Sequence, residues 1–449
     1  MTTSSDVSVG DGSKSKLPPG SAGLPVVGET FSFLKDSFAF VSDRQAKYGP
    51  IFRTQLLGKP AVVMIGPTGS EKFIDTSVIG RVDSAPPHIV ELFAGSSLPF
   101  LDDPIHRGRK ALILHAFSRE ALASYLPALD EIVAATLSRW ADQPEVHGIH
   151  EMKRLAIKAI MANFVGISDE ALLDSFVAKF SLLTAGFGAL PIKLPGSTLA
   201  RALAARDAIL VTLRTEVAKH RRAPSDDGLS RVLSAKLEDG STLDDDAALL
   251  EVHHMFLAGY IVFAEFAGIV LTLDKHPDIA AGLRAEVNQA CPSGAITHTA
   301  LANMPQVLQF VKEVKRYTPI LPFIFAKART AFEVGGYQVP KDWMVLWALR
   351  ETNMWPASFR EPTKFDPARF GGDRKEDMAS PHAFVPQGVG DETGHRCPGL
   401  DYATVFMQLF TAHLVRDFTF ALPEQDLRLM WKMIPPEPKD GLRLRLKRI

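Results

Sequence analysis

An internal apolar segment, from Met255 to Leu273, limits what this chain can fold into more than any other feature. It is long enough to cross a bilayer, and a fully buried central helix of a large protein would have the same composition. Glu265 interrupts the segment and would lie near the middle of the bilayer, where a carboxylate is costly. Because the segment is internal and has no second one like it, we expect a buried core helix and no membrane span.

Composition narrows the functional class. Hydrophobic residues make up 46% of the 449 residues, which is enough for a large core. Lys and Arg (50) nearly cancel Asp and Glu (51), so no charge excess indicates nucleic acid or an anionic membrane as partner. The two cysteines, Cys291 and Cys397, exclude a disulfide scaffold and a multi-cysteine metal site, but not a site with one thiolate. This cysteine usage favours a reducing, cytoplasmic location.

The chain divides by pattern into a tail, a helical region and β-rich segments. Residues 1–16 are polar, lack the features of a signal peptide and are predicted to be a disordered tail. Residues 51–65 and 331–348 predict short strands around glycine-containing turns, whereas residues 351–396 show little periodicity. Apolar spacing predicts helices over 118–142, 150–166, 169–184, 198–221, 245–275 and 399–416, with an apolar loop at 185–197. We therefore expect a mainly α fold with a smaller β-rich part.

A glycine-rich loop, residues 384–396, leads directly into Cys397 and then into the last predicted helix. A cysteine just before a helix N-terminus is expected to have a lowered pKa, because unpaired N–H groups and the helix dipole favour the thiolate. Glycines such as Gly390 and Gly399 would let the backbone approach a flat cofactor and donate to the sulfur. The loop therefore suits a thiolate that binds the metal of a planar cofactor, whereas a lone cysteine in a loop is more often an ordinary buried residue.

Two further segments show that this cysteine is not isolated. Glu313 and Arg316 lie one turn apart on a predicted helix, and residues 365–370 read FDPARF. In this order and spacing, the Glu-x-x-Arg helix, the Pro-x-Arg-Phe segment and the loop that ends at Cys397 resemble the signature of the cytochrome P450 family. The resemblance extends over residues 17–449, which we expect to form a single domain. It implies the helical prism of that family, with its smaller β-rich subdomain.

The resemblance also implies a cofactor and a set of residues around it. Haem b is the expected cofactor, with Cys397 as the ligand of its iron. Glu313, Arg316 and Arg369 are expected to form a buried ion-pair triad behind the haem, where losing one member would leave a buried charge unpaired. The residues expected to meet the haem propionates are His106, Arg109 and Lys110 on one side, Lys327 or Arg329 on the other, and His395 and Arg396 in the loop.

The loop before Cys397 departs from the usual pattern of the family. Thirteen positions separate Phe384 from Cys397, more than the family usually has. Its form, Pro-Gln-Gly-x-Gly followed by Gly-His-Arg-Cys-Pro-Gly, closely resembles the bacterial fatty-acid peroxygenases. That branch uses hydrogen peroxide in place of oxygen and electrons. Plant enzymes that rearrange hydroperoxides carry a long insertion in the same loop.

The central helix departs from the family as well. The family places an acid and an alcohol after Ala-Gly, where they relay protons to bound dioxygen. Here the segment reads Ala258, Gly259, Tyr260, Ile261 and Val262, and the last two side chains cannot relay a proton. We expect the usual monooxygenase cycle to be impaired. The helix also lacks the arginine with which the peroxygenase branch binds fatty-acid carboxylates, so the resemblance does not select a fatty acid as substrate.

Two side chains near this position could replace the missing relay. Glu265 shares a helical face with Ala258, Ile261 and Val262, and His254 lies one turn earlier. Either could supply a displaced acid or base. Alternatively, Glu265 could pair with a core arginine or face solvent, and His254 could be an ordinary core histidine.

An apolar pocket is expected to receive the substrate. Its predicted walls include Ala258, Gly259, Ile261, Val262, Leu321 and Phe323. Such a lining favours a lipophilic substrate, for example a fatty acid or terpenoid. We predict a haem-thiolate oxidase that uses hydrogen peroxide or a hydroperoxide. One alternative is a monooxygenase that depends on a ferredoxin-type redox partner and on its substrate for protonation. Another, of a different class, is a non-catalytic haem protein that binds or senses ligands.

Overall fold

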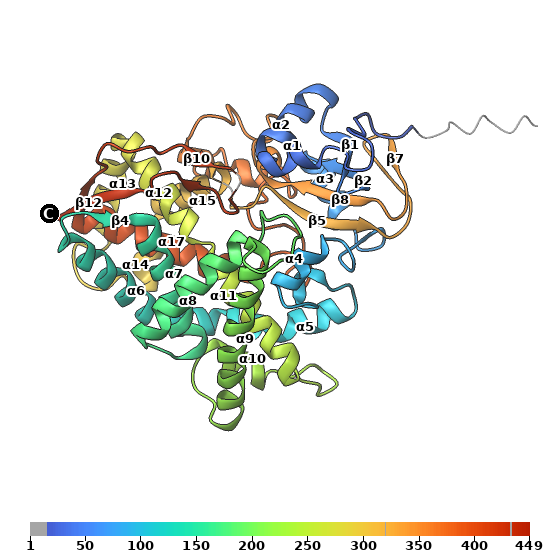
Figure 1. The fold of residues 1–449 in the computed structure, drawn as a ribbon. Helices are drawn as coiled ribbons and strands as arrows, with labels where there is room; N and C mark the ends of the chain where they lie inside the picture. The colour runs from blue at the N-terminus through green and yellow to red at the C-terminus, as the bar shows by residue number, and fades with distance from the viewer. Residues whose placement is uncertain (1–15, 319, 432) are drawn as a thin grey trace, which may run out of the picture.

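The chain folds into a large helical part, which spans the left and the bottom of Figure 1, and a smaller β-rich part, which lies at its upper right. The computed structural model describes residues 16–318, 320–431 and 433–449. The predicted tail, residues 1–16, lies outside the described residues except for Lys16. The predicted division into a mainly α fold with a smaller β-rich part is confirmed.

The β-rich part is built on one five-stranded sheet with the order β1-β2-β8-β5-β3. Its strands are β1 (Ile51–Leu56), β2 (Lys59–Met64), β3 (Ile79–Gly80), β5 (Phe323–Ala328) and β8 (Met344–Ala348). β2 runs parallel to β8, which joins the start of the chain to its last third. The helices α1 (Thr30–Lys35), α2 (Ser37–Tyr48), α3 (Gly66–Phe73) and α16 (Leu349–Asn353) and the hairpin β6 (Phe332–Val334) and β7 (Tyr337–Val339) complete this part. The strand pairs predicted over 51–65 and 331–348 are confirmed.

The helical part contains the longest elements. Its helices are α4 (Pro87–Leu92), α5 (Ile105–Leu114), α6 (Arg119–Ala141), α7 (Gly148–Val165), α8 (Glu170–Ala185), α9 (Thr198–Arg222), α10 (Gly228–Ser234), α11 (Asp245–Tyr260), α12 (Phe263–Lys275), α13 (Pro277–Ala290), α14 (His298–Ala302), α15 (Pro305–Tyr317) and α17 (Leu400–Asp417). Most predicted helices match because local signals agree with apolar spacing. Ser118, Asp169 and Ser197, for example, cap the first turns of α6, α8 and α9 with side-chain oxygens.

Short strands and turns tie the remaining segments to these helices. The strands β4 (Val146–His147), β9 (Phe418–Ala421) and β12 (Arg443–Arg448) form one small sheet, and β10 (Leu429–Met430) and β11 (Glu437–Pro438) form another. Single turns of 3-10 helix are η1 (Leu98–Phe100), η2 (His115–Phe117), η3 (Pro367–Phe370) and η4 (Glu376–Met378). Between α16 and α17 the described chain contains η3, η4 and an isolated β-bridge between Pro386 and Gly388, in agreement with the predicted lack of periodicity.

The central apolar segment is a buried core helix with an interruption. Of the most apolar window in Asp245–Lys275, 72% is buried inside the protein. The prediction of one continuous helix over 245–275 is wrong, because α11 and α12 are separated by a turn at Ile261 and Val262. There the N–H of Val262 donates to the carbonyl of Gly259 (3.3 Å) and the N–H of Glu265 to that of Val262 (2.9 Å). This tightening to 3-10 bonding coincides with two adjacent β-branched side chains.

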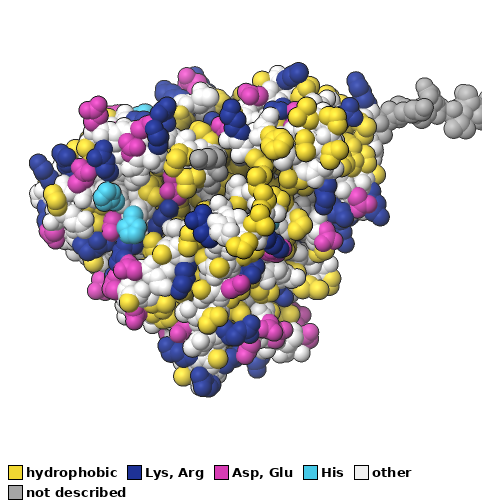
Figure 2. Space-filling model, in the orientation of Figure 1, with side chains coloured by type: hydrophobic (Ala, Val, Ile, Leu, Met, Phe, Trp, Pro, Cys, Tyr) yellow, Lys and Arg dark blue, Asp and Glu magenta, His cyan; other side chains and the backbone are white. Residues whose placement is uncertain are grey.

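The apolar connection between α8 and α9 has both an inner and an outer face. Phe187, Ala189 and Pro191 line an internal cavity, whereas Leu190 and Leu194 are exposed. A second exposed apolar group lies over α1 and the β1–β2 turn, and consists of Leu24, Val26, Phe31 and Leu57. Figure 2 shows hydrophobic side chains gathered over α1 and the neighbouring strands. Leu57 also lines the cavity, so the cavity opens next to an apolar surface.

Candidate active site

A mostly apolar cavity of about 400 Å³ lies where the helical part meets the β-rich part. Of the predicted pocket residues, Ala258, Ile261, Val262, Leu321 and Phe323 line it. Gly259 does not. It faces α7 instead, where an added Cβ would lie 2.1 Å from the Cδ1 of Ile160. Its role is therefore close helix packing rather than pocket lining.

Cys397 lines the same cavity, in the loop that precedes α17. Its N–H donates to the carbonyl of Gln387 (3.0 Å), and the Nε2 of Gln387 lies 3.8 Å from its Sγ. Burial raises the pKa of Cys397, although the N–H of Gly399 and the charges of Lys110 and Lys315 oppose this shift. Desolvation of the sulfur outweighs the effect of the helix N-terminus, from which the sequence predicted a lowered pKa. A buried thiolate here requires a further positive charge on the cavity side, which a bound metal ion would supply.

Cations without matching carboxylates surround this cysteine. Arg81, Lys110 and Arg396 line the cavity, and its described lining contains no Asp or Glu. The imidazoles of His106 and His395 stack beside them, with centroids 3.7 Å apart. Burial, reinforced by Lys110, lowers the pKa of His106 to about 4. A flat apolar cofactor with two carboxylates and a thiolate-seeking metal fits this combination, and haem has all three features.

Lys110 and the two glycines that the sequence singled out lie at the cysteine loop. Lys110 is buried and donates to the carbonyls of Gly394 (2.9 Å) and Arg396 (2.5 Å), so it also braces the loop. Gly390 has a φ of +104°, which a side chain would strain, and a Cβ on Gly399 would lie 3.9 Å from the Sγ of Cys397. These placements agree with a loop that passes close to a cofactor.

Three of the predicted propionate residues do not reach the cavity. Arg109 bonds to Glu251 (3.1 Å) and to the carbonyl of Ser96. Lys327 pairs with Asp342 (3.1 Å), and Arg329 donates to the carbonyl of Thr76. Each of these side chains bonds instead to an acceptor that the sequence did not reveal. Arg81, which the sequence did not single out, does line the cavity and lies after β3 in a segment without periodicity.

His254 is held on the cavity wall by a buried carboxylate. Among the residues of α11, α12 and their junction that line the cavity, it alone has a polar side chain. Its Nδ1 lies 3.3 Å from the Oε2 of Glu251, and the other oxygen of this carboxylate, Oε1, accepts from the N–H of Leu98 (2.9 Å) and from Arg109 (3.1 Å). A carboxylate with these donors is an acceptor, so it fixes the proton on Nδ1 and leaves Nε2 as the basic atom. The sequence singled out His254 but not Glu251.

Glu265 is buried but does not line the cavity. Burial raises the pKa of its carboxyl, opposed by the charge of Lys315 on α15, and its Oε2 has no hydrogen-bond partner in the described part of the chain. Because the helix tightens at Ile261 and Val262, Glu265 does not share their face. Of the two candidates for the displaced acid or base, His254 therefore lines the cavity and Glu265 does not.

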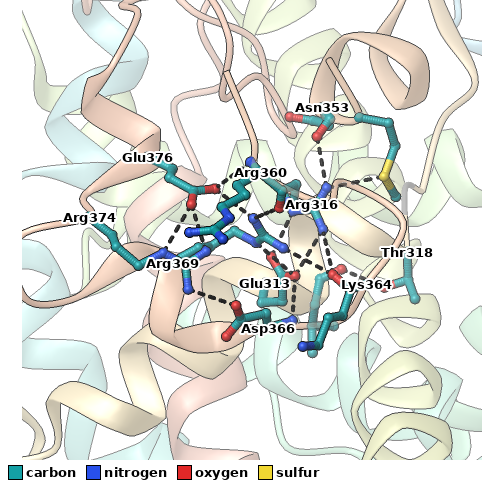
Figure 3. A network of polar contacts seen from close by, with 12 residues as sticks. Glu313, Arg316, Thr318, Asn353, Arg360, Lys364, Asp366, Arg369, Arg374 and Glu376 are labelled. Carbon is teal, nitrogen blue, oxygen red and sulfur yellow. Dashed lines mark hydrogen bonds and ion pairs between the residues drawn. The ribbon is translucent and has the colours of Figure 1, made fainter. Parts of the chain in front are cut away.

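The structure brings Glu313, Arg316 and Arg369 into one buried network, which Figure 3 shows with its neighbours. The carboxylate of Glu313 accepts from Arg316 (2.7 and 2.8 Å) and from Arg369 (3.1 Å). Glu376, which the sequence did not single out, accepts from Arg369 at 2.6 Å. Arg316 also donates to the carbonyl of Asn353 (3.0 Å), whose side chain accepts from the N–H that begins the cysteine loop at Val385.

Comparison with known proteins tests the resemblance. The family model described as Cytochrome P450 matches residues 18–439. The chain belongs to the cytochrome P450 family. It is 31% identical over 438 residues to cytochrome P450 120 of Synechocystis sp., with 96% of both chains covered. It is 28% identical to abscisic acid 8'-hydroxylase 2 of Arabidopsis thaliana, covering 96% of this chain and 90% of the relative.

Solved structures agree on the cytochrome P450 fold. The retinoic acid-bound cyanobacterial CYP120A1 superposes with a TM-score of 0.89 at 29% identity, covering 97% of this chain and 99% of the other. A variant of cytochrome P450 OleT in complex with arachidonic acid gives 0.83 at 21% identity, with 97% and 99% covered, and shows the fold alone. The predicted P450 fold is confirmed, and the family carries haem whose iron binds a cysteine thiolate.

The two cysteines allow a direct test of that ligand. We expect Cys397→Ser to lose the Soret band that the reduced carbon monoxide complex of a haem-thiolate protein shows, because only Cys397 lines the cavity. Cys291→Ser is the matched control, since the Cys291 thiol is buried elsewhere and lies 3.4 Å from the carbonyl of Ser293. An unchanged band in Cys397→Ser would contradict the assignment.

The network around Glu313 allows a test of stability. Glu313→Gln leaves two buried guanidinium groups short of one negative charge, so we expect the free energy of unfolding to fall by about 3–5 kcal/mol. Arg374→Ala is the control, because Arg374 bonds to Glu376 at the rim, where its side chain is 37% exposed. We expect this control to lose less than about 1 kcal/mol. Urea unfolding of both holo-proteins measures the difference, and similar losses would refute a central role for Glu313.

Proposed function

We propose that this protein is a haem-thiolate oxidase of lipophilic substrates that takes its oxygen from hydrogen peroxide or a hydroperoxide. Haem, held by Cys397 and the surrounding cations, would supply the oxidising iron. The proposal rests on the side chains by which the central helices, α11 and α12, line the cavity. Apart from His254, the residues that line the cavity there are Leu257, Ala258, Ile261 and Val262, and none of them can deliver a proton. Peroxide brings its own protons and electrons, so it needs one group that accepts and returns a peroxide proton but not the relay that delivers protons to dioxygen.

The cavity supports a lipophilic substrate, such as a fatty acid or terpenoid. Its walls are mostly aliphatic and aromatic, and it opens beside the exposed apolar group formed by Leu24, Val26, Phe31 and Leu57. Relatives act on or bind hydrophobic compounds: one is named for abscisic acid, and solved structures contain retinoic acid or arachidonic acid. The buried central helix and the two unpaired cysteines support a cytoplasmic location.

His254 and Glu251 supply the acid–base group that a peroxide reaction needs. With its proton fixed on Nδ1, His254 presents Nε2 as a base on the cavity wall. That atom has no hydrogen-bond partner among the described residues. It is placed to accept the proton of a peroxide and to return it, while Glu251 stabilises the imidazolium that forms in between. Arg109 and the N–H of Leu98 hold the Glu251 side chain in place.

A second candidate is a monooxygenase that receives electrons from a ferredoxin-type partner. The names of the relatives favour it, because the abscisic acid relatives are called hydroxylases and another relative is called beta-amyrin 28-monooxygenase. In that case the substrate or His254 would have to provide the protons that Ile261 and Val262 cannot.

The oxygen source is testable with the purified holo-protein. With retinoic acid and arachidonic acid as probe substrates, we expect product from hydrogen peroxide alone, at a rate about a hundredfold above that with NADPH, ferredoxin reductase, ferredoxin and oxygen. Mass spectrometry of the products measures both rates. Val262→Thr restores an alcohol at the helix junction and should raise only the reductase-driven rate.

The three functions give different results in this experiment. Product that depends on the reductase and not on peroxide would support the monooxygenase and refute the peroxide proposal. No product under either condition, with spectral binding of the probes intact, would indicate a non-catalytic ligand binder.

The role of His254 is testable by two substitutions. We expect His254→Phe to lower the peroxide-driven kcat by about a hundredfold or more, because it removes the basic Nε2. His254→Gln keeps a hydrogen-bonding group beside Glu251 but cannot carry a proton near neutral pH, so it should lose as much. Steady-state kinetics with hydrogen peroxide measure both, and a His254→Gln variant with the activity of the parent protein would exclude proton transfer.

A further inference from the structure

Lys315 is a buried cation that the function described so far does not use. It lies on α15, is 4% exposed, and sits between Val314 and the Arg316 of the ion-pair network. Its Nζ donates to the Oε1 of Gln387 (2.5 Å), to the Oγ1 of Thr404 (2.8 Å) and to the carbonyl of Leu400 (3.4 Å). All three acceptors are neutral. No carboxylate among the described residues lies within ion-pair distance of this ammonium, so a buried charge remains to be compensated.

Gln387 links this ammonium to the cysteine sulfur. Its Oε1 accepts from Lys315, its Nε2 lies 3.8 Å from the Sγ of Cys397, and its carbonyl accepts from the N–H of Cys397 (3.0 Å). An ammonium has only donors, so it requires the oxygen of the amide on its side. The NH₂ group must then face the sulfur. Lys315 thereby selects the orientation of the amide in which Gln387 donates to Cys397.

The acidic groups that face Lys315 come from three parts of the fold. Glu265 on α12 is one, and it is itself buried, with one oxygen that has no partner. The thiolate of Cys397 and the carboxylate of Asp401 on α17 are the others. A thiolate next to an oriented amide and a buried ammonium gains electrostatic stabilisation that solvent would otherwise provide.

We propose that Lys315 is a positioning residue for the Cys397 thiolate, which it stabilises by its charge and by orienting the side chain of Gln387 as a donor to the sulfur. Lys315 acts through Gln387 and does not touch the reacting atoms. By drawing electron density from the sulfur, the pair would weaken donation from thiolate to iron and so raise the reduction potential of the haem. The inference rests on thiolate ligation of haem and holds for either oxygen source.

Lys315→Met tests the proposal, because methionine keeps much of the buried chain but removes the charge. In the substrate-free holo-protein we expect the equilibrium constant for reduction of the iron to fall about tenfold, which is about 59 mV more negative for one electron. We expect the iron–sulfur stretching frequency in resonance Raman spectra to rise, since the sulfur then donates more strongly. Spectroelectrochemical titration measures the potential without substrate or oxidant.

Two further variants make the result decisive. Lys312→Met is the matched control, because Lys312 lies on the same helix but pairs with Asp377 (2.7 Å) away from the loop. Gln387→Met removes the amide donor and leaves Lys315 in place, so it should shift both readouts in the same direction by a smaller amount. It also decides the question if Lys315→Met does not fold.

The proposal fails if neither Lys315→Met nor Gln387→Met moves the potential and the stretching frequency beyond the values of Lys312→Met. Failure of the peroxide proposal would leave these readouts untouched, because they need no turnover. A Cys397→Ser protein that kept its thiolate-type spectrum would instead remove the ligation on which both proposals depend.

Discussion

The buried ion-pair network around Glu313 is the interaction on which the rest of the site depends. Glu313 and Glu376 balance the charges of Arg316 and Arg369 in the interior, so no member can be lost without leaving a charge uncompensated. The two guanidinium groups have more donors than these carboxylates can accept. The spare donors bind main-chain carbonyls of Asn353, Arg360 and Lys364. A long segment with few regular elements is thereby fixed by side chains from a helix and a single turn.

Two neighbouring residues of the helix α15 contribute to two different sites. Arg316 points into the network, and Asn353 extends that network to the start of the cysteine loop at Val385. Lys315, one position earlier, points to Gln387 and the first turns of α17. On the other side of the loop, Lys110 binds the carbonyls of two residues that precede Cys397. Two cations, Lys315 and Lys110, therefore hold the loop, and a small shift of α15 would change the surroundings of the Cys397 sulfur.

The sequence predicted what depends on local pattern and missed what depends on tertiary pairing. Apolar spacing predicted most helices, and motif spacing identified Cys397, Glu313 and Arg369. Arg109, Lys327 and Arg329 were misplaced because each found a nearby acceptor that spacing cannot reveal. Arg81 was missed because the segment after β3 has no periodic signal. Helical spacing also placed Glu265 on the cavity face, since it cannot anticipate a tightened turn at Ile261 and Val262.

The unmatched cations of the cavity tie cofactor supply to folding. Arg81, Lys110 and Arg396 repel one another across a space of low polarity, and the described lining offers no carboxylate to offset them. A dianionic ligand removes this repulsion only in the folded state. Its binding free energy therefore adds to the stability of the fold by mass action, in proportion to the logarithm of its concentration. The amount of folded protein in a cell should therefore follow the availability of haem. When haem is scarce, a larger fraction of the chain should be unfolded and open to proteolysis.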